Sequence, residues 1–384
     1  MRTLSVEERR RRLGRRHHLS EPAAAPAAVA GDLVGLHSSD PTTVFLSAWA
    51  RVNGLRVAEV EKALYDDRSL LRMLGMRRTM FVVPVDMAPE LKMACADRYV
   101  TAERRRLVGF LEDQLVPGNG SAWLDDVIDR TLDALHRRGE ATARELVEDV
   151  PELGAKLHFG QGTFGLSTRV LFFLATDLRI IRARPLGSWK SSQYRWTTLD
   201  HWLPGALPTI EPEDGRRRLA ERWLRTFGPG TLTDLKWWTG WTVATTRAAV
   251  EAAGAVAVQL TDGVGFVLPD DLDETEEVGE WVALLPGLDS TVMGWKERDW
   301  YLSGYQEQLF DGNGNAGPTV WSNGRVIGGW GQDSEGRVRF ELFEPVPGQV
   351  LDRIVAEAER LDAWLEGEVV KPRFPTPLER RLRN

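Results

Sequence analysis

An order of helices followed by a hairpin recurs along this chain and restricts its possible folds. The clearest copy covers residues 123–197, where three segments with apolar residues at helical spacing precede two strand-like segments. A similar order covers residues 214–268, and residues 42–84 contain two helical segments and an apolar strand. Three helices and a hairpin are the elements of a winged helix. We therefore expect an α+β fold with three tandem winged-helix units.

The pattern changes after the third unit. The acidic run at 270–277 is typical of a solvated linker. Short alternating segments separated by Asn323-Gly324 and Glu335-Gly336 then predict a small C-terminal β-barrel or open sheet, followed by a closing helix at 349–365. We expect winged helices over 1–116, 117–206 and 207–272, the barrel-like domain with its helix over 273–370, and a poorly ordered or surface-lying tail over 371–384.

Charge is divided unevenly between the two halves of the chain. Residues 1–200 carry 30 Lys and Arg against 26 Asp and Glu, whereas residues 201–384 carry 19 against 30, so that the net charge is −7. A polyanion would have to bind the N-terminal half or a local basic groove. An arginine-rich start at 9–16 reads as the basic face of a first helix.

Cysteine and histidine usage restricts the kinds of site. Cys95 is the only cysteine, which excludes a disulfide within the chain and a zinc finger and fits a reducing compartment. The histidines show no metal-ligand spacing, and no apolar run is long enough to span a bilayer. We expect no metal, no cofactor and no membrane partner.

The stretch from Leu36 to Pro41 carries three polar side chains just before a helix. Asp40 at the N-cap and Pro41 at the first helical position are a strong start signal. His37 and Ser39 then lie near the positive end of the helix dipole, where anions and polarised water are stabilised. Composition alone favours ordinary loop residues at the start of a helix, and a functional site is the alternative.

Several segments together resemble the AlkZ/AlkX (YcaQ-type) family of bacterial DNA glycosylases, in particular its actinobacterial members. The segments that carry the resemblance are 36–55, 75–84, 187–196, 228–240, 284–299 and 318–343. The resemblance implies three winged-helix units in tandem and a C-terminal β-barrel. In that family a Gln-x-Gln or Gln-x-Asp pair precedes the helix that starts here at Asp40-Pro41. The pair falls on His37 and Ser39 of this chain, so neither glutamine is present.

The resemblance implies hydrolysis of the N-glycosidic bond of alkylated or crosslinked purine adducts in duplex DNA. An alkylated purine is already cationic, so the reaction needs an aligned water and a field that stabilises the sugar cation. A neutral His37 would orient or deprotonate that water, and Ser39 would give it a second hydrogen bond. Asp40 either caps the helix, orients His37 or faces the sugar. Asp289 matches a family segment near the cleft, or closes a turn after a buried strand.

Basic and polar side chains on the expected hairpins and helices are candidates for contacts with DNA. Each of them is otherwise a solvated surface charge or a hairpin residue. The candidates are Arg51, Arg77, Arg78, Arg182, Arg184, Lys190, Gln193 and Arg195.

Two further functions stay open. A non-catalytic winged-helix DNA-binding protein, either a regulator or a lesion binder, would keep the fold without the glutamines, and a scaffold would bind neither DNA nor lesion. For the enzyme we expect double-stranded DNA as partner, a monomeric state and a cytoplasmic, nucleoid-associated location. The enzymatic hypothesis requires that the His37 imidazole face a trough wide enough for a double helix.

Overall fold

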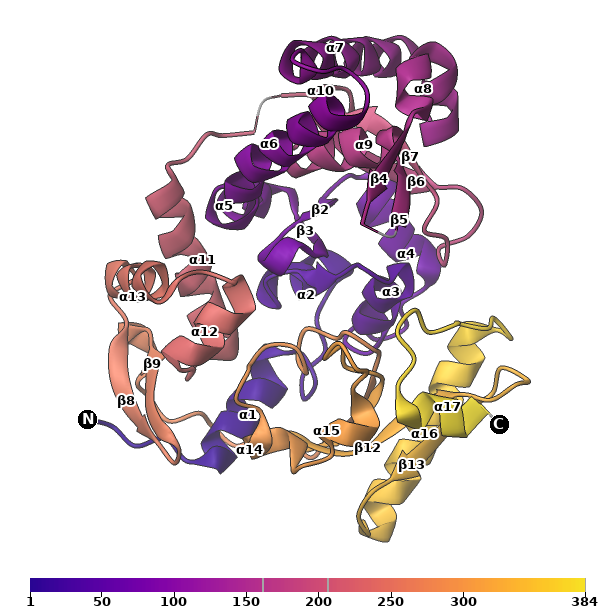
Figure 1. The fold of residues 1–384 in the computed structure, drawn as a ribbon. Coiled ribbons are helices and arrows are strands. Elements are labelled where there is room, and N and C mark those ends of the chain that lie inside the picture. Colours follow the sequence, from indigo (N-terminus) through magenta and orange to yellow (C-terminus); the bar gives the residue numbers. More distant parts are fainter. Residues whose placement is uncertain (161, 206, 384) are drawn as a thin grey trace.

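The computed structural model describes residues 1–160, 162–205 and 207–383 and has a mixed α and β architecture (Figure 1). Residues 206 and 384, which end two of the expected units, lie outside the described residues. Helices make up most of the regular structure, and the described strands form small separate sheets. No described helix combines the length and the apolar character that crossing a membrane requires.

The first helix-and-hairpin unit holds a three-stranded antiparallel sheet. Its strands are β1 (Leu36–His37), β2 (Leu70–Leu74) and β3 (Met80–Pro84), in the order β1-β3-β2. Its helices are α2 (Pro26–Asp32), α3 (Pro41–Trp49) and α4 (Val57–Glu61), and α4 continues as a π-helical turn at Lys62–Asp66. The two helices and the apolar strand predicted here are confirmed. The β1 strand ends directly before the loop that starts α3, so the sheet fixes where that loop begins.

The second unit follows a long connecting helix. The connection consists of α5 (Ala88–Leu91), a π-helical turn at Lys92–Ala96 and α6 (Asp97–Gln114). The unit contains α7 (Gly120–Arg138), α8 (Ala143–Asp149), α9 (Leu166–Thr176), the hairpin β6 (Ile180–Pro185) and β7 (Tyr194–Thr198), and α10 (Leu199–Trp202). An additional hairpin, β4 (Lys156–Phe159) and β5 (Gly162–Gly165), separates α8 from α9 and is absent from the predicted order.

The third unit repeats the order of the second. It contains α11 (Pro212–Phe227), α12 (Leu232–Thr239), α13 (Val243–Ala252) and the hairpin β8 (Val256–Leu260) and β9 (Gly263–Val267). In each of the three units a strand or a single bridge lies between the first and second helices: β1, the bridge Ala141–Trp196 and the bridge Gly230–Phe266. In each unit the segment between the first two helices therefore pairs with a strand of the hairpin, so this pairing is part of the repeat.

The C-terminal part is built on an antiparallel sheet. Its strands β10 (Val282–Leu285), β11 (Thr319–Ser322), β12 (Arg325–Gln332) and β13 (Val338–Leu342) pair in chain order. Of the two predicted alternatives, the described strands form the open sheet, with β10 and β13 at its edges. The helices of this part are α14 (Asp299–Leu302), α15 (Gln306–Leu309), α16 (Gly348–Leu365) and α17 (Pro377–Arg383). The closing helix predicted at 349–365 corresponds to α16, which packs on β10 and β13.

Residues 371–383 lie mostly at the surface, one of the two states expected of the tail, but part of the segment is anchored in the core. Leu378 of α17 is fully buried, and α17 packs against β12. The C-terminal strap, residues 369–376, crosses from α16 to α17 and passes beside the start of α3, where the backbone N–H of Arg373 donates to Asp40 (Figure 1). The proline and basic residues that suggested a tail therefore belong to a segment that packs with little regular structure.

The basic first helix, α1 (Val6–Arg16), is also placed differently from the prediction. Its arginines pair with the acidic run rather than forming a free basic face, with Arg12 and Arg16 both bound to Asp271 at 2.8 and 2.5 Å. The α1 helix lies against the C-terminal sheet so closely that a Cβ atom on Gly14 would be 2.6 Å from the Trp281 indole nitrogen. The acidic run is therefore a docking segment for α1, which packs against the C-terminal part.

Buried side chains form two main clusters. The larger one joins the first unit, the third unit and the C-terminal sheet, whereas the second unit has its own core around α6, α7 and α9. Trp238 and Trp241 lie in the larger core, whereas Trp237 is only partly buried. The hairpin β6–β7 thus reaches the first unit from a separately packed body.

Candidate functional site

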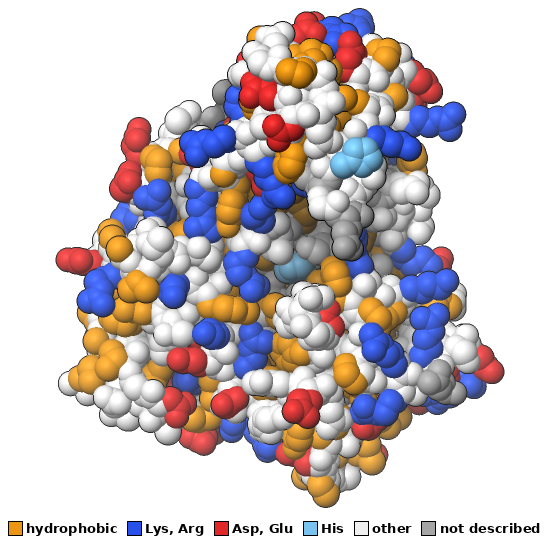
Figure 2. Space-filling model, in the orientation of Figure 1, with side chains coloured by type: hydrophobic (Ala, Val, Ile, Leu, Met, Phe, Trp, Pro, Cys, Tyr) orange, Lys and Arg blue, Asp and Glu red, His pale blue; other side chains and the backbone are white. Residues whose placement is uncertain are grey.

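The loop between β1 and α3 lies at the edge of a hollow with a volume of about 810 Å³. Ser38 and Ser39 line it from the loop, while Arg182 and Tyr194 line it from the hairpin β6–β7. Figure 2 shows a recess across the middle of this face, with Lys and Arg side chains along its edges. The loop singled out in the sequence and the second hairpin therefore meet at one concave site.

His37 is buried next to this hollow rather than exposed in it, which differs from the expectation that its imidazole faces a wide trough. Its side chain is 5% exposed, and its ring lies edge-on to Phe81 with the ring centroids 5.2 Å apart. The backbone N–H of Ser39 donates to its Nδ1 at 3.4 Å, so the ring proton is on Nε2. Burial, with a smaller contribution from the nearby Arg77 charge, lowers the pKa of His37 to about 3. The imidazole is therefore neutral at neutral pH and is a hydrogen-bond donor through Nε2.

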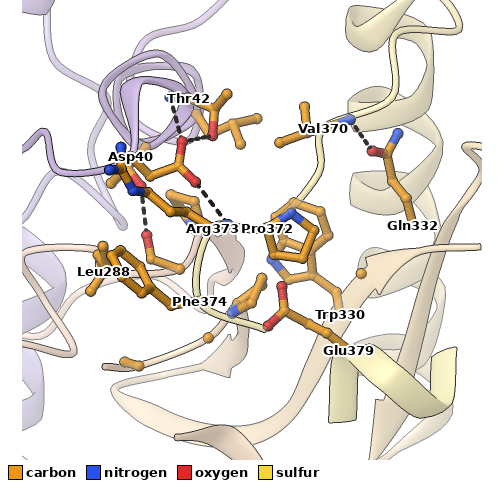
Figure 3. Close-up of a pocket in the computed structure, with 18 of the residues that line it drawn as sticks. Asp40, Thr42, Leu288, Trp330, Gln332, Val370, Pro372, Arg373, Phe374 and Glu379 are labelled. Carbon is orange, nitrogen blue, oxygen red and sulfur yellow. Dashed lines mark hydrogen bonds between the residues drawn. The ribbon is translucent and has the colours of Figure 1, made fainter. Parts of the chain in front are cut away.

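Asp40 caps α3 and also holds the C-terminal strap. One carboxylate oxygen accepts hydrogen bonds from the N–H and the hydroxyl of Thr42 at 2.9 and 2.7 Å, and the other accepts from the Arg373 N–H at 3.3 Å (Figure 3). Of the three roles expected for Asp40, these contacts are those of a helix cap. The same contacts tie the start of α3 to a segment more than 300 residues later in the chain.

A small second cavity of about 70 Å³ lies under the C-terminal strap. Figure 3 shows Asp40, Trp330, Pro372, Phe374 and Glu379 around it. The Glu379 carboxylate accepts from the Thr376 N–H and hydroxyl, and burial raises the pKa of Glu379. These contacts hold the strap against the sheet.

Asp289 and Arg51 form a buried ion pair away from the hollow. Two Arg51 nitrogens donate to the two Asp289 oxygens at 2.9 and 2.7 Å, and neither side chain is exposed. Burial by itself raises the pKa of Asp289, but the Arg51 charge and the hydrogen bonds from Arg51, Ser47 and Thr291 lower it overall. This burial corrects the expectation that Arg51 contacts phosphates, and it places Asp289 out of reach of a substrate.

Most of the other predicted DNA contacts are paired with acidic groups. Arg78 pairs with Glu103, Arg184 with Glu61 and Asp66, Lys190 with Glu368, and Arg195 with Glu140 and Glu145. Gln193 is exposed and lines the hollow. Arg77 stacks on Trp237, with its guanidinium carbon 4.1 Å from the ring centroid. Arg182 lines the hollow and has no acidic partner among the described residues.

Sequence reasoning missed Ser38 and Arg373, which line the hollow, and Arg72, which lies next to it against the Tyr194 ring. Arg72 is a charged residue inside the apolar strand β2 and is only 4% exposed, which was the one available signal. Ser38 was overlooked because it lies between His37 and Ser39, the two positions on which the family's motif falls. Arg373 lies in the segment interpreted as a tail.

The site offers hydrogen-bond donors and positive charge rather than metal ligands. Within residues 1–160, 162–205 and 207–383, no group of three or more His, Cys, Asp and Glu side chains could hold a metal ion. A buried neutral imidazole, two serines and several guanidinium groups can bind an anion and orient a water.

Comparisons with known proteins give two matches. Residues 30–364 match a family model described as DNA glycosylase AlkZ-like. The solved structure of Streptomyces sahachiroi DNA glycosylase AlkZ is similar, with a TM-score of 0.72 and 19% sequence identity over 94% of this chain and 97% of that chain. No curated protein sequence gives a significant match. The family match confirms the resemblance inferred from the sequence segments, and the structural match shows the same fold.

Proposed function

The chain belongs to the family of AlkZ-like DNA glycosylases, and from this premise we propose that it hydrolyses the N-glycosidic bond of alkylated or crosslinked purine adducts in duplex DNA. We propose that His37 and Ser39 orient the attacking water. The observation that carries the proposal is that the loop at the position of the family's Gln-x-Gln or Gln-x-Asp pair adjoins a hollow lined by cations. Histidine and serine there would replace the paired amides.

The proposed reaction places few demands on the protein. The C1′–N bond of a cationic adduct breaks with its electron pair going to the base, which leaves as a neutral molecule, and the sugar becomes oxocarbenium-like. A water that accepts from the His37 Nε2–H and donates to the Ser39 hydroxyl keeps one lone pair free to attack C1′. The water then loses its proton to solvent. Because His37 is only 5% exposed, the proposal places a single water, and no bulky substrate group, against its imidazole.

We interpret the three helix-and-hairpin units as winged helices, since each has the order helix, strand or bridge, helix, helix, hairpin. Such units would cradle a duplex against the hollow, with Arg182 and Gln193 of the second hairpin facing it. We propose that the protein acts as a monomer on double-stranded DNA in the cytoplasm, at the nucleoid.

Base release from adducted DNA tests the proposal. Duplexes carrying alkylated and crosslinked purines should release free base and leave an alkali-labile abasic site. His37→Ala should abolish release, and His37→Gln, which returns an amide to this position, should retain it. His136→Ala is the matched control, because His136 is half exposed on α7 and pairs with Asp200 on the surface. Retained release in a folded His37→Ala protein would remove His37 from the mechanism.

Burial of His37 favours one alternative, a non-catalytic DNA-binding protein that regulates transcription or binds lesions. That protein would bind duplexes with strong salt dependence and release no base from any adduct in the panel. Binding of adducted over undamaged duplex without release would identify a lesion binder.

A further inference from the structure

Three arginines, two that line the hollow and one that lies next to it, are beyond ion-pair distance of any carboxylate in the described part of the chain. Arg72, Arg182 and Arg373 have no ion pair among the described residues, whereas most arginines of this chain do. They come from β2, from β6 and from the C-terminal strap. Guanidinium groups that converge from three distant segments without a carboxylate partner can bind one anion together.

The three side chains are close to one another and to Ser39. The guanidinium carbons of Arg72 and Arg182 lie 4.7 and 5.4 Å from the centroid of one ring, that of Tyr194. Arg373 donates to the Ser39 carbonyl at 3.0 Å. Burial, with additional contributions from the Arg72 and Arg373 charges, lowers the pKa of Arg182 to about 10. The cluster therefore lies directly beside the loop that carries His37.

Buried donors in the same place have no acceptor. The hydroxyls of Ser38 and Tyr194, both residues that line the hollow, find no hydrogen-bond partner in the described part of the chain, although the residues are 3% and 9% exposed. The same holds for two guanidinium nitrogens of Arg72. A buried donor left without an acceptor costs about 1–3 kcal/mol. One group with several anionic oxygens would satisfy these donors together.

We propose that this cluster is a phosphate site and that it binds one phosphodiester of the DNA strand carrying the damaged nucleotide. Arg182 and Arg373 hold the phosphate oxygens, the Ser38 and Tyr194 hydroxyls donate to them, and Arg72 adds charge from behind the Tyr194 ring. Because Ser39 belongs both to the hollow and to the proposed water-binding pair, the bound phosphate lies next to the nucleotide whose base is removed. The inference rests on the proposed function and adds the C-terminal strap to the DNA-binding surface.

Neutralising single phosphates tests the site. A duplex with a stable abasic analogue is made with one methylphosphonate at a time around the lesion, and its binding is measured by fluorescence anisotropy. For the wild-type protein we expect one position next to the lesion to weaken binding at least tenfold. The same substitution should weaken binding to Arg182→Gln or Arg373→Gln less than twofold, because the partner charge is already gone. In each variant the slope of log affinity against log salt should also become shallower by about 0.9, since one phosphate contact is lost.

Arg130→Gln is the matched control, because Arg130 is in the same unit but is paired with Asp126 and Glu152. It should keep both the salt slope and the methylphosphonate effect. Inorganic phosphate at millimolar concentration should not compete with the duplex; competition that disappears in Arg182→Gln would instead identify a site for the free ion. Equal methylphosphonate effects in wild-type protein and both arginine variants would overturn the proposal.

The outcome is separable from that of the proposed function. Coupling between Arg182 and one phosphate, with no base release from any adduct, would keep the phosphate site and reject the glycosylase chemistry of this chain. Base release without coupling would keep the chemistry and reject the site.

Discussion

Replacing Arg51 distinguishes a structural role from a DNA contact. The guanidinium makes five hydrogen bonds of 2.7–2.9 Å, two to Asp289 and one each to the Ser47 carbonyl, the His17 carbonyl and the Thr291 hydroxyl. Arg51→Met keeps the aliphatic volume but leaves the Asp289 carboxylate buried without a counter-ion. Removing one partner of a buried pair costs about 3–5 kcal/mol. We expect a loss of that size in the free energy of unfolding.

Urea denaturation followed by tryptophan fluorescence measures this loss. The control is Arg353→Met, since Arg353 pairs with Glu280 on the surface at 3.3 Å and such pairs contribute about 0–1 kcal/mol. In the double variant Arg51→Met with Asp289→Asn, the second change should restore part of the lost stability, because the unpaired charge is removed. A loss below about 1 kcal/mol for Arg51→Met would refute the reasoning.

Acid and salt give two further readouts of the same pair. The pKa of Asp289 is lowered in the folded state, so the pair stabilises the fold fully above the unfolded value near 4 and this stabilisation is lost as pH falls through the folded pKa. Arg51→Met should abolish that part of the acid dependence. For Arg51→Met, the slope of log affinity against log salt in duplex binding should equal that of the wild-type protein. If Arg51 contacted a phosphate, losing that contact would make the slope shallower by about 0.9.

Two other predictions follow from the described contacts. The rate of base release should be constant between pH 5 and 8, because burial holds the pKa of His37 at about 3; a fall in rate centred near 6.5 would show a solvent-exposed imidazole. Gly14→Ala should destabilise the protein by about 1–3 kcal/mol, since the added Cβ would meet the Trp281 ring. Gly109→Ala lies inside α6 with open space around it and should instead stabilise the protein by up to about 1 kcal/mol. If Gly14→Ala raised the melting temperature as much as Gly109→Ala does, the docking of α1 would be refuted.

Local signals predicted the parts of the fold that depend on neighbours in sequence. The Asp40-Pro41 start of α3, the repeated helices and hairpin of the second and third units and the closing helix α16 all follow from caps, periodicity and turns. The hairpin β4–β5 was missed because its strands are short and lie between two helices, where the alternation of polar and apolar residues is too brief to recognise.

Long-range pairing could not be predicted from these signals. Arg51 and Asp289 are 238 positions apart, and either residue alone is consistent with a surface charge. The acidic run resembles a solvated linker until the arginines of α1 are brought against it. The C-terminal strap and the start of α17 lack periodicity, so nothing in their sequence shows that Thr376 and Leu378 are buried.

The distinction between local and long-range determinants also explains how a glycosylase of this family can depart from the family's Gln-x-Gln or Gln-x-Asp motif. Orienting one water requires a donor and an acceptor at fixed positions, and a neutral imidazole with a serine hydroxyl supplies both, as two amides do. The positive charge that we propose near the sugar is harder to replace, because Arg182 and Arg373 at the hollow and Arg72 next to it come from β6, the C-terminal strap and β2, and only the complete fold brings them together. Asp40 connects the two requirements, since it caps the helix that follows the proposed water-binding loop and accepts a hydrogen bond from the strap that carries Arg373. Asp40→Ala should therefore impair phosphate binding through the strap as well as the position of the loop, although its carboxylate touches neither water nor DNA in this mechanism.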